Sequence, residues 1–150
     1  MPDLTRAPRT ILTTLMLPLA DRSLVLPNVA VAELIDDQPR QPVLGAPDWH
    51  LGMIVWRDLQ IPLVSFEAAC GAHTQVAQGP RVVVLNCLSD GPLQFMAILI
   101  QGVPRSCKVD SQLSYVDVPL APLELAAVQI SDRVARIPDL DGLERLLLSY

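Results

Sequence analysis

Three cysteines and two histidines are the side chains of this 150-residue chain best suited to nucleophilic or metal chemistry. Such chemistry needs short, fixed spacings between ligands, or a base beside the nucleophile. No Cys-x-x-Cys or Gly-x-Ser-x-Gly motif occurs. A glycine separates Cys70 from His73, so the pair does not form one helical face, and His50 follows a turn. No catalytic residue is predicted. The cysteines are interpreted as small buried hydrophobic residues or idle thiols: Cys70, Cys87 and Cys107.

Acidic side chains form two close pairs, Asp36-Asp37 and Asp139/Asp141. Each pair lies in a predicted turn or helix cap, where solvated carboxylates are common. The seven glycines stand singly, so no glycine-rich loop is available to hold a phosphate. We therefore expect no metal site, no cofactor and no enzymatic activity.

The charge pattern excludes nucleic acid as a partner. Net charge is −5, and Lys108 is the only lysine. Binding to phosphates needs clustered positive charge, and an anionic membrane surface would repel this chain for the same reason. The N-terminal residues do not resemble a signal peptide, and the apolar run 11–19 is too short to span a bilayer. The protein is expected to be cytoplasmic, without direct membrane insertion.

Two charged residues lie within apolar segments. Glu33 is inside residues 29–35, and Arg57 ends residues 51–57. A charge in such a segment normally lies at an edge or is paired. Spacing alone leaves two alternatives open, a specific pair or two unrelated surface charges.

The elements that would position these residues are predicted to be short strands. Fourteen prolines are spread along the chain, which excludes long helices, and the low aromatic content of 4% indicates an aliphatic core. Short runs rich in Leu, Val and Ile, separated by turn residues, are typical of sandwiches or small barrels. A hairpin is predicted around residues 89–92. The predicted strands are residues 11–19, 22–26, 51–57, 59–64, 81–87, 93–100, 125–130 and 133–137.

Helical signals are few. Ser65 is predicted to cap a turn over residues 66–70, and Asn28 to cap another from Val29. A terminal helix after Asp139 is predicted to place three leucines on one face. Two halves of similar strand content are expected to meet around residues 73–80, whether or not each half is contiguous. The three leucines are Leu140, Leu143 and Leu147.

Residues 31–35, 46–49, 51–54 and 61–64, together with Arg57, resemble CheW-family adaptors. In that family a V-x-E-I piece is followed by N-x-P-x-x-x-x-G-V-I-N-L-R-G-x-V-I-P-V-x-D-L. The resemblance extends over about residues 12–148 and is most specific between residues 48 and 64.

The resemblance implies an all-β fold of two SH3-like five-stranded β-barrel subdomains with short helices and a C-terminal helix. These would occupy residues 11–150, after a flexible segment 1–10. It also implies a non-enzymatic adaptor that binds the regulatory domain of a CheA-type histidine kinase and the cytoplasmic tip of a methyl-accepting chemoreceptor. Family members have a salt bridge at the positions of Glu33 and Arg57. Core packing remains an equal alternative for Val31 and Leu34. The residues expected to bind partners are Val31, Glu33, Leu34, Gly52, Met53 and Arg57.

Some residues depart from the family pattern. Residues 55–58 read Val-Trp-Arg-Asp in place of N-L-R-G, so a tight turn must form without glycine. Ser65 replaces an aspartate before the short helix, which keeps a good N-cap. The tyrosine-glycine piece before the final strands is missing around residues 123–128. Residues 26–34 and 63–67 look more like divergent adaptors of pilus-associated, twitching-motility chemosensory systems.

Two alternatives belong to other classes. One is a small-barrel ligand-binding protein or enzyme that uses a cleft between the halves, which would require titratable residues converging there. The other is a free-standing structural SH3-like module, which would have no kinase or receptor partner.

Overall fold

Strands dominate the structure, a computed structural model that describes residues 11–71, 79–87, 91–110 and 113–149. The all-β prediction and the C-terminal helix are confirmed. The segment 1–10, expected to be flexible, and His73 lie outside the described residues.

The first of two sheets, here called the middle sheet, comes from one continuous part of the chain. Its strand order is β3-β6-β7-β5-β4. The predicted hairpin is confirmed, since β6 and β7 pair antiparallel, whereas β5 and β7 pair in parallel. The strands are β3 (Val31–Asp36), β4 (His50–Trp56), β5 (Leu59–Val64), β6 (Arg81–Asn86) and β7 (Phe95–Ile100).

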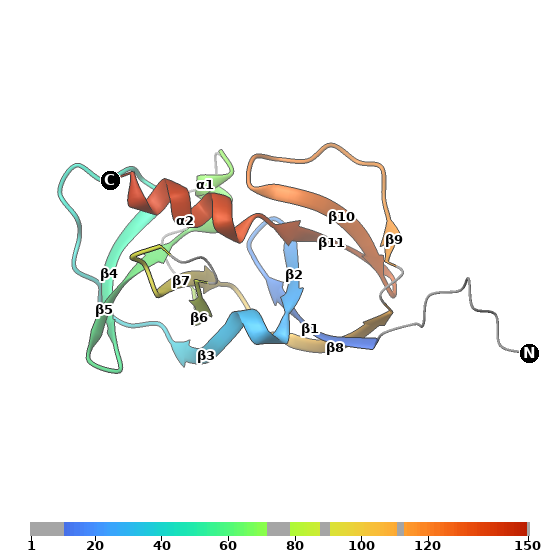
Figure 1. The fold of residues 1–150 in the computed structure, drawn as a ribbon, viewed down its shortest axis with the longest axis horizontal. Coiled ribbons are helices and arrows are strands. Elements are labelled where there is room, and N and C mark those ends of the chain that lie inside the picture. The colour runs from blue at the N-terminus through green and yellow to red at the C-terminus, as the bar shows by residue number, and fades with distance from the viewer. Residues whose placement is uncertain (1–10, 72–78, 88–90, 111–112, 150) are drawn as a thin grey trace, which may run out of the picture.

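The second sheet, here called the terminal sheet, is built from both ends of the chain. Its order is β8-β1-β2-β11-β10-β9. It has six strands rather than the expected five, because a two-residue strand, β9, adds to one edge. The two sheets lie side by side in Figure 1. The strands are β1 (Ile11–Pro18), β2 (Ser23–Pro27), β8 (Arg105–Asp110), β9 (Ser114–Tyr115), β10 (Glu124–Ile130) and β11 (Arg133–Pro138).

The expectation that two halves meet around residues 73–80 is wrong. Strands before and after this segment belong to the same sheet, since β5 pairs with β7. The terminal sheet instead joins the two ends of the chain where β2 pairs with β11, through Leu24 and Arg136. Apolar runs indicate where strands are, but long-range pairing decides which strands share a sheet.

Three strands are not among those predicted from the sequence: β3, β8 and β9. β8 reads Arg-Ser-Cys-Lys-Val-Asp and has no buried residue, so its apolar content is too low to indicate a strand. The predicted cap at Asn28 is wrong. The short 3₁₀ helix η1 (Asn28–Ala30) begins at Asn28, and Pro27 stands in the cap position without a side-chain bond.

The other two predicted helices are present. In α1 (Phe66–Ala69) the Ser65 hydroxyl accepts a hydrogen bond from the Ala68 N–H at 3.4 Å. The terminal helix α2 (Leu140–Leu148) starts at Asp139, whose carboxylate accepts from the Gly142 N–H at 3.0 Å. In Figure 1, α2 runs from the end of β11 across to the middle sheet.

Buried apolar side chains form three clusters. One fills the inside of the middle sheet, and one fills the inside of the terminal sheet. The third, here called the shared core, contains side chains from both sheets and from α2. The fully buried members of the shared core include Leu17, Leu24, Leu85, Ile98 and Leu143.

Candidate functional site

Glu33 and Arg57 lie together where the two outer strands of the middle sheet, β3 and β4, come close to each other. Arg57 Nη2 is 3.4 Å from Glu33 Oε1. The two residues are 24 positions apart, on β3 and on the turn after β4. The structure therefore favours a specific pair over two unrelated surface charges. The Arg57 side chain is 67% exposed and the Glu33 side chain 42% exposed, so the ion pair by itself contributes only about 0–1 kcal/mol.

Trp56 joins this pair, which sequence reasoning missed. Its indole Nε1–H donates to Glu33 Oε1 at 2.8 Å. The Arg57 guanidinium lies over the same ring, 4.6 Å from the ring centroid. Phe95 packs edge-on against the ring at 4.7 Å, and Trp56 is only 6% exposed. Glu33, Trp56 and Arg57 together are called the Glu33 cluster below.

The turn between β4 and β5 places Arg57 over Trp56. Trp56 pairs with Leu59, so Arg57 and Asp58 form a two-residue loop. Their φ angles are +49° and +64°, as a type I′ hairpin turn requires. The turn expected to form without glycine therefore does so by holding two ordinary residues in the left-handed region, at a cost in backbone strain.

Val31 and Leu34 lie on the opposite face of β3 from Glu33. Glu33 pairs with Val84, which belongs to the cluster inside the middle sheet. Leu34 pairs with Val83, on the face of the shared core, and a register shift after Val31 places Val31 on that face too. Val31 packs against the shared core, and Leu34 is 38% exposed. The structure therefore does not bring these two residues to the Glu33 cluster.

Gly52 and Met53 are residues of β4. They lie beside Gln41, which is on the connection between β3 and β4. Met53 and Gln41 exchange two backbone hydrogen bonds, both 2.8 Å. Gly52 is buried, and its φ is +125° at a register shift between His50 and Gly52. A Cβ on Gly52 would lie 2.6 Å from the Gln41 carbonyl oxygen. Gly52 thus permits the close approach of another backbone segment, and its location gives it a structural role.

A second charged network lies in the terminal sheet. Arg22 contacts Glu124 at 2.7 Å and Asp21 at 2.9 Å, and Glu124 also contacts Arg136 at 3.2 Å. The hydrogen bond from Arg22 lowers the pKa of the Asp21 carboxyl, and the same hydrogen bond raises the pKa of the Arg22 guanidinium. The Arg22 guanidinium lies 6.0 Å from the centroid of the Phe66 ring on α1. The network therefore ties the start of β2 to β10, β11 and α1.

Burial shifts the pKa values of two thiols and of His50 toward their uncharged forms. Burial raises the pKa of Cys70 to about 11 and that of Cys87 to about 12. Burial lowers the pKa of His50, whose Nδ1 accepts a backbone hydrogen bond from Gly52 at 3.2 Å. Within the described part of the chain, no group of three or more His, Cys, Asp or Glu side chains gathers as a metal site would require.

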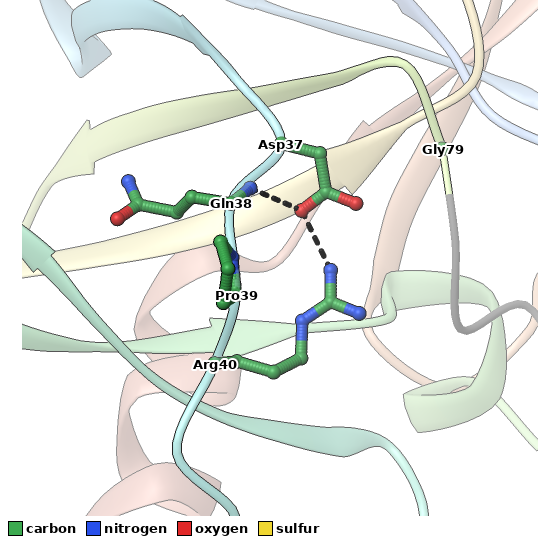
Figure 2. Close-up of a pocket in the computed structure, with 5 residues that line it drawn as sticks. All are labelled: Asp37, Gln38, Pro39, Arg40 and Gly79. Atoms are coloured by element: carbon green, nitrogen blue, oxygen red, sulfur yellow. Dashed lines mark hydrogen bonds and ion pairs between the residues drawn. The ribbon is translucent and has the colours of Figure 1, made fainter.

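Figure 2 shows the residues lining an open cavity of about 540 Å³ between the β3–β4 connection and Gly79. Asp37 and Arg40 point toward each other there and form an ion pair at 2.6 Å. Their charges largely neutralise each other. The cavity lies beside the middle sheet and not between the two sheets, so it does not match the cleft that the enzyme or ligand-binding alternative requires.

Fold and site together define a class of protein: an all-β chain of two small barrel-like subdomains around a shared core, with a polar cluster at the edge of one of them. Residues 13–146 match the family model described as the CheW-like domain. Because this match spans most of the chain, the protein belongs to the CheW-like domain family, and the family expected from the sequence is confirmed.

Among solved structures, the chain is similar to the scaffolding protein TtCheW from Thermoanaerobacter tengcongensis. The TM-score is 0.72 and the identity 16%, over 86% of this chain and 89% of that one. At this identity the likeness shows the fold. No curated protein matches the sequence significantly. In the described residues, no helix is both long and apolar enough to span a bilayer.

Proposed function

We propose that this protein is a non-enzymatic adaptor of a chemosensory signalling complex, working in the cytoplasm. The match of residues 13–146 to the CheW-like domain is the observation that carries the proposal. The similar fold of a protein described as a scaffolding protein supports it. In this role the protein couples other proteins by contact and performs no chemistry itself.

The proposed partners are the regulatory domain of a CheA-type histidine kinase and the cytoplasmic tip of a methyl-accepting chemoreceptor. An interface of standard size buries about 1,200–2,000 Å² in total. A protein made of two subdomains can offer two separate surfaces of this size, one for each partner. The Glu33 cluster is proposed to belong to the kinase- and receptor-facing side, because it is a partly exposed charged group on a rigid aromatic support.

Charge reversal at the Glu33 cluster tests this surface. Glu33→Lys and Arg57→Glu are expected to weaken co-purification with the kinase regulatory domain while the far-UV circular dichroism stays native. Asp36→Lys is the matched control, because Asp36 lies on the same strand and forms an exposed ion pair with Arg81 at 3.7 Å. The control is expected to bind like wild type. Unchanged binding by both folded cluster variants would remove this surface from the proposal.

The signalling output is proposed to be pilus-based, in line with the resemblance of residues 26–34 and 63–67 to twitching-motility adaptors. Deletion of the gene is then expected to impair twitching on a surface and to leave swimming unchanged. Loss of swimming with normal twitching would assign the protein to flagellar chemotaxis instead.

A further inference from the structure

The ion pair between Glu33 and Arg57 is too weak to fix its own geometry. At 3.4 Å the contact is long for a charge-assisted hydrogen bond, which is normally about 2.7–2.9 Å. Both side chains are more than two-fifths exposed, so water and salt screen their attraction. Arginine also loses much rotamer freedom when it is held in one place. Another group must therefore hold the two charges.

Trp56 touches both charges and is itself immobilised. Its indole N–H is 2.8 Å from Glu33 Oε1, the same oxygen that Arg57 contacts. Its ring is 4.6 Å from the Arg57 guanidinium, within the range of a cation–π contact. The edge of Phe95 fixes one side of the ring, and the body of the indole packs in the cluster inside the middle sheet.

The two contacts use different parts of the indole. The N–H is a donor only, and it satisfies the carboxylate in the plane of the ring. The ring face is electron-rich and attracts the guanidinium from above. A single buried side chain therefore orients an anion from β3 and a cation from the β4–β5 turn. A phenylalanine or leucine at this position could not do both.

We infer that Trp56 is the positioning residue of the Glu33 cluster, and that it holds Glu33 and Arg57 in the arrangement that a partner protein recognises. The second part rests on the proposed adaptor function. Arg57 keeps a largely exposed guanidinium, whose single hydrogen bond among the described residues is the one to Glu33. Its remaining N–H donors can therefore meet an acceptor on the partner.

The first arm of the test uses the free, full-length protein. The chain has two tryptophans, so its nuclear magnetic resonance spectrum contains two indole N–H signals, and Trp56→Phe assigns them. Glu33→Ala is expected to move the Trp56 signal and to speed its exchange with solvent at least threefold, while the Trp49 signal stays in place. An unchanged Trp56 signal would overturn the positioning role.

The second arm measures affinity for the kinase regulatory domain by calorimetry. Trp56→Phe keeps an aromatic ring but loses the N–H donor, and it is expected to weaken binding about three- to tenfold. Arg57→Ala should weaken binding by a similar factor. The double variant, Trp56→Phe with Arg57→Ala, should bind with an affinity no lower than that of the single variant that binds less tightly. Trp49→Phe, which removes the other indole, is the control and should bind like wild type.

The outcomes separate the two claims. If the wild-type protein does not bind the kinase domain while the indole signal responds to Glu33→Ala, the proposed function fails and the positioning of the charges stands. If the wild type binds and Trp56→Phe binds equally well, the adaptor function stands and the inference fails. Fully additive losses in the double variant would also overturn the inference, because Trp56 would then act independently of Arg57.

Discussion

Replacing Gly52 by alanine should destabilise the protein strongly, because two costs act at one position. The φ of +125° lies outside the narrow region near +50° to +70° that non-glycine residues sometimes adopt. Backbone strain of this kind costs about 1–3 kcal/mol. The new Cβ would also meet the Gln41 carbonyl oxygen at 2.6 Å, well below the ordinary contact distance of 3.4–4 Å.

The second cost has no easy relief. The atom in the way is backbone, and Gln41 is held by two hydrogen bonds to Met53. Moving Gln41 would weaken both bonds, each with a net worth of about 0.5–1.5 kcal/mol. Together with the backbone strain, we expect Gly52→Ala to lower the free energy of unfolding by about 2–5 kcal/mol.

Gly45→Ala is a matched control for the strain alone. Gly45 has a φ of +79°, and no atom lies within 4 Å of the position its Cβ would take. Its replacement should cost about 1 kcal/mol. Urea unfolding followed by tryptophan fluorescence measures both values. In a heating experiment, a loss of about 3 kcal/mol corresponds to a fall in Tm of roughly 6–12 °C for a chain of this size.

Equal stability of Gly52→Ala and Gly45→Ala would refute the reasoning. The close approach of Gln41 would then not require glycine, and the structural role assigned to Gly52 would lose its basis. A direct contact with a partner, which is the role expected from the family resemblance, would again be the better explanation for glycine at this position.

Three further outcomes are expected. Asp58→Gly should raise the free energy of unfolding by about 0.5–1 kcal/mol in urea titration, because glycine adopts the left-handed conformation of this turn without strain. Leu143→Ala, in the shared core, should lower it by about 2–5 kcal/mol, whereas Leu148→Ala, at a 46% exposed site, should change it by less than about 0.5 kcal/mol. In native protein at pH 8, iodoacetamide should modify Cys70 and Cys87 far more slowly than in urea, because burial raises both pKa values and leaves little reactive thiolate. Mass spectrometry of the alkylated peptides measures this, and equal rates in both states would contradict it.

The strands with the plainest sequence signal are those whose buried residues are consecutive. β6 and β7 each contain four or five buried residues in a row, which gives a plain apolar run bounded by turn residues. β8 could not be predicted, since it lies at a sheet edge and contains three charged residues among its six. β3 is an edge strand of the middle sheet, and Glu33 interrupts its apolar pattern. Edge strands bury only part of their surface, so their sequences carry a weaker signal.

The candidate site was only partly predictable for a different reason. The resemblance brought Glu33 and Arg57 together, and the structure shows them in contact. The part played by Trp56 depends on how the middle sheet curves, because β3 and β4 are its opposite edges and yet meet at this side chain. The curvature of the sheet cannot be predicted from the spacing of residues in the sequence. The face on which Val31 and Leu34 lie likewise depends on a register shift between Val31 and Glu33, which could not be predicted from the sequence.

The shared core ties the middle sheet to the terminal sheet and to α2, although residues 31–100 are continuous in the chain. One face of this sheet packs against Leu17 and Leu24 of the terminal sheet and against Leu143 of α2. All three are fully buried, so separating the sheets would expose a continuous apolar surface. The ends of the chain therefore complete the core of its middle. The two subdomains are therefore packed on one common apolar layer, so separating them would cost the burial of that layer.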